Sequence, residues 1–414
     1  MKDFMPIKNQ KKILSENVLA VSAKARKAKE QDNNIINATA GTYYDNAGHI
    51  KVFKCIEEAF NHPTYNNYLS YASIQGSSEF MDCVKSWILG EDYTQVYTDY
   101  KINVIATPGG TGAISLAVGT YLEKGDAVLL PNIMWPAYTQ IVNNQEVDYL
   151  TYKLYNEVGN FNLENLKEVA TITSKNYGKL FIVINDPCHN PTGFVMTHEE
   201  YIQLVKVLNE LSKEVKIVLL MDIAYLDYGT LRGTKTREYF KEFKNLTNNV
   251  MVLFAFSASK TFGIYGLRLG ALVQLTKDDN QANLFKTSTS YFARSMWSNS
   301  THLGMSIVTK TLLDPLKKQT FIKELEQASF DLEERSTLFL QELDKYNVPH
   351  APYQNGFFVL LLVNNLDFEE EIEKGGAYGC HFQCVYRLSH AIINKEEASR
   401  LAVIVGKAYQ KIVK

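Results

Sequence analysis

The sequence lacks three features that would place it in a special class of protein. It has no charge imbalance: the chain has 43 lysine and arginine residues and 45 aspartate and glutamate residues, which gives a net charge of −2. A general attraction to nucleic acid or to an anionic membrane is therefore not expected. No apolar run approaches the ~18 residues of a membrane span, and no signal-peptide core follows the basic start. A small-molecule partner and a cytoplasmic location are the expectations that remain.

Cysteine is scarce. The chain has five, an odd number scattered over its length: Cys55, Cys83, Cys188, Cys380 and Cys384. This pattern favours reduced thiols over a disulfide framework. Cys380 and Cys384 lie near His381 and His390, but no second ligand pair with zinc-like spacing appears elsewhere, so no metal is expected.

What is present is a chain long enough for a large core. With 414 residues, 46% of them hydrophobic, it should form roughly two to three domains of ~150 residues. Between residues 101 and 275, helical stretches alternate with short β-rich runs: INVIAT, DAVLLP, KLFIVIND, KIVLLMDIAY, NVMVLFAFS and LGALVQL. Such alternation predicts an α/β layer structure around a mostly parallel sheet.

The pattern changes after residue 315. A long charged helix is expected over 317–343, followed by mixed strand and helix, which indicates a second, smaller α+β domain. No internal repeat or low-complexity linker separates the parts. We expect an N-terminal arm and part of the small domain at 1–50, the large domain at 51–314 and the small C-terminal domain at 315–414.

In an open α/β sheet, ligands gather at the carboxyl ends of the strands. The segment TPGGTGAISLAV (107–118) is a glycine-rich turn that follows a strand and opens a helix, where free N–H groups suit a phosphate. Gly110, Thr111 and Gly112 would approach the anion. A plain tight turn is the other interpretation, since the segment matches neither the dinucleotide fingerprint nor the ATP-type phosphate loop.

Two further strand ends carry polar groups. NDPCHNPTG (185–193) turns the chain at Asn190, which turn chemistry alone would explain. In MDIAYLDY (221–228), Asp222 ends a strongly apolar strand and Tyr225 follows three residues later. A carboxylate there either caps a helix or, if buried, needs a cationic partner such as a pyridinium nitrogen.

A fourth segment, SASKTFGIYGLRLG (257–270), places Lys260 directly after an apolar strand. Desolvation lowers the pKa of a lysine, which is the condition for a nucleophilic or Schiff-base amine. Ser257 and Arg268 flank it and are suited to a phosphate. The alternative is that Lys260 extends to solvent and Arg268 pairs with a carboxylate.

Taken together and in this order, the four segments resemble the class I aminotransferases of pyridoxal 5′-phosphate (PLP) fold type I, most closely the aspartate and aromatic amino acid aminotransferases. The resemblance runs from about residue 37 to the C-terminus. It implies a large domain with a mostly parallel seven-stranded sheet covered by helices, plus a smaller α+β domain. It also implies PLP as cofactor, held as a Schiff base by Lys260.

The resemblance assigns roles residue by residue. Lys260, Asp222 and Tyr225 would be catalytic, with Asp222 on the pyridine nitrogen. The cofactor would be bound by Gly110, Thr111, Trp135, Asn190, Asp222, Tyr225, Ser257, Lys260, Arg268 and, from the neighbouring subunit of a homodimer, Tyr68. The substrate would contact Gly41, Trp135, Asn190 and Phe358. Arg387 would bind its α-carboxylate, and Arg294, donated by the partner subunit, would bind its distal carboxylate.

The implied reaction moves an amino group from an amino acid, aspartate or aromatic or both, to 2-oxoglutarate. Tyr138 departs from the pattern, because the aspartate enzymes usually carry histidine after WPN, and the first forty residues match poorly. Another fold type I enzyme, such as a carbon–sulfur lyase, is the alternative. A nucleotide-binding dehydrogenase would need an acidic residue about 20 residues after the GGTG turn, and Asp126 comes too early. A regulatory binding domain would normally bring a DNA-binding module, and none is evident.

Overall fold

The computed structural model describes residues 4–10, 12, 18–61, 68–229, 234–382 and 385–413. They fall within two compact units. The large unit comprises His49–Glu334 and Pro352–Phe357, and the small unit comprises Met1–Gly48, Arg335–Ala351 and Phe358–Lys414. Helix α15 (Pro315–Asp344) contributes residues to both. The domain ranges expected from the sequence stay a prediction.

A seven-stranded sheet forms the centre of the large unit. Its strands are β2 (Lys101–Thr107), β3 (Ala127–Pro131), β4 (Asp148–Tyr152), β5 (Lys179–Asn185), β6 (Lys216–Asp222), β7 (Val250–Ser257) and β8 (Gly270–Thr276), in the order β2-β8-β7-β6-β5-β3-β4. β8 runs antiparallel to both its neighbours, and every other neighbouring pair is parallel. The expected α/β fold with a mostly parallel seven-stranded sheet is confirmed.

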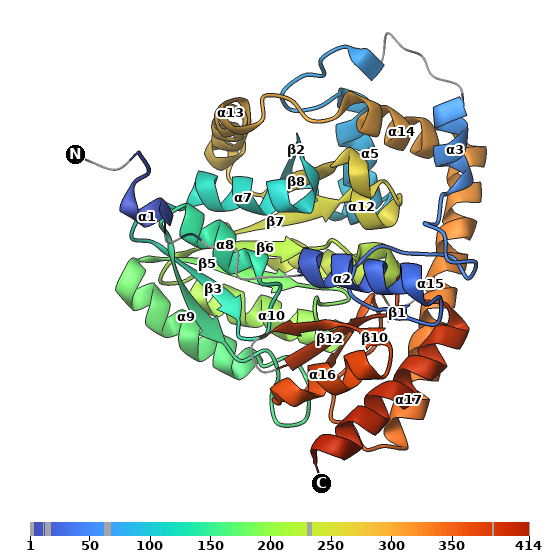
Figure 1. The fold of residues 1–414 in the computed structure, drawn as a ribbon. Helices are drawn as coiled ribbons and strands as arrows, with labels where there is room; N and C mark the ends of the chain where they lie inside the picture. The colour runs from blue at the N-terminus through green and yellow to red at the C-terminus, as the bar shows by residue number, and fades with distance from the viewer. Residues whose placement is uncertain are drawn as a thin grey trace. The chain divides into compact units, whose positions relative to one another are not determined.

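Helices cover the sheet because its central strands are apolar on both faces; β7, for example, is buried at every position. Helices α7 (Gly109–Tyr121), α8 (Ala137–Asn144) and α13 (Asp279–Met296) pack over one face, and α9 (Leu163–Tyr177) and α10 (His198–Leu211) over the other (Figure 1). The remaining elements of the large unit are α3 (Lys54–Asn61), α5 (Ser78–Leu89), α6 (Tyr93–Val96), α11 (Thr234–Phe240), α12 (Ala258–Thr261), α14 (His302–Leu312) and the 3-10 turns Leu226–Tyr228, Lys241–Asn245 and Tyr265–Leu267.

The small unit is α+β, as expected. It contains α1 (Ile7–Gln10), α2 (Val18–Gln31), β1 (Ile36–Asn37), β9 (Phe358–Leu361), α16 (Leu366–Lys374), β10 (Ala377–Tyr378), β11 (Cys380–Phe382), β12 (Val385–Ser389) and α17 (Lys395–Ile412). β1 pairs with β10 in parallel, and β11, β12 and β9 form an antiparallel sheet. Cys384, considered above as a metal ligand, lies outside the described residues. Within the described ranges, each helix is too short or too polar to span a bilayer.

The strand order places several polar residues at one edge of the large sheet. Asn185 ends β5 and pairs with Asp222, which ends β6. Ser257 ends β7 opposite Gly270, the first residue of the reversed strand β8, and Gly270 also faces Thr107 at the end of β2. The carboxyl ends of the parallel strands and the start of β8 therefore meet at the same edge, where ligands of α/β sheets bind.

Candidate active site

The start of α7 forms an anion-binding cradle at this edge. The first N–H groups of a helix have no partner within it, and the helix dipole adds positive potential there. The backbone comes close to its neighbours: a Cβ on Gly110 would lie 3.2 Å from Cβ of Ser257. A Cβ on Gly270 would lie 2.5 Å from both the Gly109 carbonyl carbon and the Phe256 oxygen. Only glycine permits this approach at Gly270.

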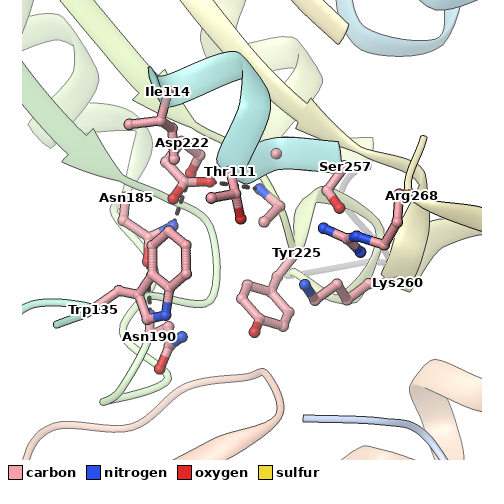
Figure 2. A pocket seen from close by; sticks show the side chains of 12 residues that line it. Thr111, Ile114, Trp135, Asn185, Asn190, Asp222, Tyr225, Ser257, Lys260 and Arg268 are labelled. Atoms are coloured by element: carbon pink, nitrogen blue, oxygen red, sulfur yellow. Dashed lines mark hydrogen bonds between the residues drawn. The ribbon is translucent and has the colours of Figure 1, made fainter. Parts of the chain in front are cut away.

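Ser257 and Arg268 lie beside the cradle, together with Lys260 (Figure 2). The Ser257 hydroxyl accepts a hydrogen bond from the Ser259 N–H at 3.4 Å. Arg268 has a left-handed backbone with φ of 52°, and its Nη1 donates to Ser259 Oγ at 3.1 Å and to the Tyr265 carbonyl at 3.0 Å. These contacts hold the guanidinium at the pocket wall, where it can bind a phosphate.

Hydrogen bonds to the Lys260 backbone and from the next residue, Thr261, hold this part of the chain in place. Tyr228 donates its hydroxyl to the Lys260 carbonyl at 3.1 Å, and Thr261 donates to the buried carboxylate of Asp227 at 2.6 Å. The Lys260 ammonium nitrogen lies 5.3 Å from the centre of the Tyr225 ring. Burial lowers the pKa of Lys260 to about 8; the negative charge of Asp222 opposes this shift and Arg268 adds to it.

Asp222 is buried at the end of β6, with 4% of its surface exposed. Tyr138 donates its hydroxyl to Oδ2 at 2.5 Å, and the Ala224 N–H donates to Oδ1 at 3.1 Å. Burial raises the pKa of Asp222, while these hydrogen bonds and the charge of Lys260 act in the opposite direction. A carboxylate held in this way is suited to face a cationic ring nitrogen.

Asn190 and Trp135 line the opposite side of the pocket (Figure 2). The side-chain oxygen of Asn185 accepts from the Asn190 N–H at 2.7 Å, and the Asn185 amide donates to the Asp222 carbonyl at 2.8 Å. The Trp135 and Tyr138 rings meet edge to face, with centres 5.5 Å apart. Asn185 thus connects the turn that carries Asn190 to strand β6.

All the expected cofactor residues except Tyr68 line this one pocket, which encloses about 480 Å³ of empty space including its mouth. Three further lining residues, Ile114, Asn185 and Ala224, were not expected. Asn185 ends a strand, so the rule used for Asp222 and Ser257 would also have found it. Nothing in the sequence distinguishes Ile114 or Ala224 from other apolar residues.

Tyr68 and Arg294 are located elsewhere on the large unit. Tyr68 accepts a hydrogen bond from Lys310 at 2.9 Å and lines a surface hollow with residues of 297–303. Arg294 is exposed in the last turn of α13, where Nη1 donates to the Ser298 hydroxyl. Neither residue lines the Lys260 pocket of its own chain.

The expected substrate residues of the small unit lie together. The Arg387 guanidinium carbon is 4.2 Å from the centre of the Phe358 ring, and Nη2 donates to the Thr39 carbonyl at 3.2 Å. A Cβ on Gly41 would lie only 2.7 Å from Cζ of Phe358. Arg387 is 5% exposed. An arginine held between a ring and a backbone carbonyl has few ways to turn, which suits recognition of a carboxylate.

The pocket of the large unit fits PLP by its own donor set. The cradle at α7, with Ser257 and Arg268, matches a phosphate, and the glycines leave room that a side chain would fill. Asp222 supplies a buried negative charge for the ring nitrogen, and Lys260 supplies an amine whose pKa of about 8 leaves part of it neutral near pH 7. Trp135 offers an aromatic face for a flat ring.

Comparisons with known proteins identify the family of the chain. The family model "Aminotransferase class I and II" matches residues 33–402. A mitochondrial aspartate aminotransferase of Arabidopsis thaliana is 26% identical over 330 residues, 78% of this chain and 74% of the relative.

Two solved structures also match. The crystal structure of an aminotransferase from Anaerococcus prevotii aligns with a TM-score of 0.93 at 26% identity and covers 99% of both chains. An aromatic-amino-acid aminotransferase from Burkholderia pseudomallei, covalently bound to pyridoxal phosphate, has a TM-score of 0.78 at 20% identity, with 98% of this chain and 100% of that chain covered. With its fold, its lysine pocket and a family match over most of its length, the chain belongs to the class I and II aminotransferases, a family that uses pyridoxal phosphate.

Proposed function

We propose that this aminotransferase moves an amino group from aspartate, an aromatic amino acid or both to 2-oxoglutarate, with PLP carried as a Schiff base on Lys260. The observation that carries the proposal is the convergence of an amine, a buried carboxylate and a helix start in one pocket. These three groups match the aldehyde, the ring nitrogen and the phosphate of PLP.

When bound, PLP supplies an electron-withdrawing ring for the electrons left by loss of the substrate Cα proton. Lys260 would hold the cofactor and would then take and return that proton at its Nζ. A pKa of about 8 makes its amine both basic enough to accept a proton and neutral enough to react near pH 7. The contact of Tyr228 with the Lys260 carbonyl and that of Thr261 with Asp227 hold the backbone that carries this amine.

The other pocket residues bind and orient. Asp222 would keep a negative charge against the ring nitrogen, and Asn190 and Tyr225 would hydrogen-bond the ring oxygen. Ser257 and Arg268 would anchor the phosphate beside the first turn of α7. Ser257 and Arg268 would thus hold the cofactor at one end and Asp222 at the other, within reach of Lys260.

Two arginines would set the substrate class. Arg387 would bind the α-carboxylate that every amino acid carries, and Arg294 the distal carboxylate of aspartate or glutamate. Replacing Arg387 with alanine should raise KM for every amino donor. Replacing Arg294 with alanine should reduce kcat/KM for aspartate far more than for phenylalanine. Equal losses on both donors would remove Arg294 from the specificity site.

We also propose a homodimer that shares its active sites, because Tyr68 and Arg294 lie outside the pocket of their own chain. Exposed apolar side chains accompany them, among them Leu69, Tyr71 and Tyr291 at 81%, 93% and 74% exposure. Light scattering should give twice the 47.0 kDa chain mass. A mixture of refolded Lys260→Ala and Arg294→Ala chains should recover aspartate activity, because one site of each mixed dimer is intact. A mixture no more active than its parents would contradict sharing.

The decisive experiment traps the cofactor. The purified protein with PLP should be yellow, and borohydride should bleach it and leave the label on the Lys260 peptide. Glutamate should form from aspartate or phenylalanine with 2-oxoglutarate, and Lys260→Ala should abolish turnover. With cystathionine as the substrate instead, release of a thiol, ammonia and pyruvate would favour the carbon–sulfur lyase alternative. Full activity of the lysine variant would exclude the proposed role of Lys260.

A further inference from the structure

Tyr138 is a buried side chain that meets the site without lining the pocket. It lies in the first turn of α8, it is 1% exposed, and its hydroxyl donates to Oδ2 of Asp222 at 2.5 Å. The ring packs within the apolar cluster between the sheet and the helices α7, α8 and α13. The Tyr138 and Trp135 rings also meet edge to face, with ring centres 5.5 Å apart. The hydroxyl therefore reaches Asp222 from a rigid position.

We infer that Tyr138 is a positioning residue: its hydroxyl keeps Asp222 ionised and turned toward the pocket, so that the carboxylate can face the ring nitrogen of the cofactor. The effect of Tyr138 on catalysis rests on the proposed function, because it requires bound PLP. The hydrogen bond itself can be tested without the cofactor, because Asp222 also acts on Lys260.

The direction of the hydrogen bond follows from the chemistry of the two groups. A carboxylate only accepts, and burial together with the neighbouring charge of Asp222 raises the pKa of Tyr138 well above its ordinary value, so the phenol keeps its proton. Burial alone would favour a neutral Asp222, and the donated proton opposes this effect. A hydrogen bond to a charged group changes a protonation constant by roughly ten- to a hundredfold.

The groups that face this pair come from several elements. Lys260 on α12 acts on Asp222, Arg268 acts on Lys260, and Tyr225 and Tyr152 lie near Tyr138. Burial raises the pKa of Tyr152 well above its ordinary value, so this phenol keeps its proton. Lys260 is thus the cation whose protonation reports the charge of Asp222: a negative Asp222 supports the ammonium form, and a neutral Asp222 does not.

The apoenzyme provides the test. Tyr138→Phe removes the hydroxyl and keeps the ring that packs on Trp135. With less support for its charge, Asp222 should take up a proton more readily, and the pKa of Lys260 should fall. Reductive methylation with formaldehyde, followed by mass spectrometry of the Lys260 peptide, measures the neutral amine against pH. We expect the midpoint to fall by roughly 0.5 pH unit, about a threefold faster reaction at pH 7.

A matched control is available within the same unit. Tyr201 is also fully buried, and its hydroxyl donates to a buried aspartate, Asp186, at 2.6 Å, but neither residue lines the pocket. Tyr201→Phe should cost similar thermal stability and leave the Lys260 midpoint unchanged. In an Asp222→Asn background, Tyr138→Phe should have no further effect on that midpoint, because the two changes act through one carboxylate.

The inference is overturned if Tyr138→Phe leaves the midpoint at its original pH, or shifts it equally when Asp222 is asparagine. A second readout concerns the loaded enzyme: the Kd for PLP should rise about tenfold in Tyr138→Phe and stay unchanged in Tyr201→Phe. If the unaltered protein does not bind PLP, the proposed function fails while the methylation experiment still decides the role of Tyr138.

Discussion

Two buried aspartates at the same edge of the large sheet accept the same kinds of hydrogen bond, one from a tyrosine hydroxyl and one from a backbone N–H, but their surroundings differ. Asp222 accepts from the Tyr138 hydroxyl and the Ala224 N–H, and Asp186 accepts from the Tyr201 hydroxyl and the Met196 N–H. The Asp186 N–H even donates to the Asp222 carbonyl, at 3.2 Å. The tyrosines come from different helices: α8 supplies the partner of Asp222, and α10 supplies the partner of Asp186.

These helices cover opposite faces of the sheet (Figure 1). Asn185 is the register partner of Asp222 and Asp186 is the next residue, so the alternation of side chains along a strand puts the two carboxyl groups on opposite faces. Asp222 shares a pocket with Lys260. Asp186 is 1% exposed, and burial raises its pKa, with a smaller contribution in the same direction from the charge of Glu200. The comparison teaches that a tyrosine–aspartate hydrogen bond is not by itself a sign of catalysis. Asp222 differs from Asp186 because a cation, Lys260, and an open pocket lie beside it.

The most direct way to break the comparison is to neutralise each carboxyl in turn. Asp222→Asn should lower kcat on the order of a hundredfold or more, because the ring nitrogen would lose its counter-charge. Asp186→Asn should lower it by only a small factor, since it removes no charge from the pocket. Steady-state kinetics with aspartate and 2-oxoglutarate measures both. Equal losses would mean that the two sites are not functionally distinct.

The cation beside Asp222 predicts a pH dependence that Asp186 has no means to produce. Only the neutral amine of Lys260 reacts with an aldehyde, and its pKa is lowered by burial to about 8. The rate of covalent PLP uptake by the apoenzyme should therefore rise about tenfold per pH unit below this value and level off above it. Stopped-flow absorbance at a series of pH values tests this. A midpoint near the ordinary lysine value would show that the amine is not desolvated.

A third buried aspartate, Asp227, sharpens the comparison. It does not line the pocket, but it is hydrogen-bonded to Thr261, the residue after Lys260. It accepts from Thr261 at 2.6 Å and from the Trp87 indole at 3.2 Å, and it pairs with Arg237. Thr261→Val keeps the shape and removes one donor, so PLP occupancy and kcat should fall severalfold with little change in KM. Thr261→Ser should restore both. Failure of serine to rescue would indicate a packing effect instead.

The smallest effect concerns stability around Asp186. Burial raises the pKa of this carboxyl to about 7 from an ordinary 3.8, so the folded state favours its protonated form. The stability that this group contributes is complete below about pH 3.8 and is lost as the pH rises through about 7. Asp186→Asn should flatten the decline of the melting temperature in this window by a few degrees. A parallel decline in both proteins would contradict the buried, protonated carboxyl.

Much of the large unit was predictable from the sequence because its central strands are buried on both faces and read as apolar runs. Strand β4 (DYLTY) was not expected: it lies at the edge of the sheet, and Tyr152 alone among its residues is buried. Lys260, Asp222 and Ser257 were expected at the site because each follows or ends an apolar run. The rule depends only on local sequence, so it can be applied without knowing how the helices pack on the sheet.

Contacts between distant segments were not predictable in this way. The hydrogen bond between Tyr138 and Asp222 joins residues 84 positions apart and depends on where α8 packs. The same holds for Asp227, whose partners come from α5, α11 and α12. Residue types suggest which groups can react, whereas the packing of helices on the sheet decides which of them meet.

The single reversed strand has a consequence for engineering. Ser257 at the end of β7 pairs with Gly270 at the start of β8, so the two ends of the segment 258–269 are held side by side at the sheet edge. The amine of Lys260 and the guanidinium of Arg268 both belong to this segment. The distance between them is therefore set within one short segment. We expect that this segment can be exchanged as a whole between relatives, whereas an insertion within it would move the amine away from the guanidinium.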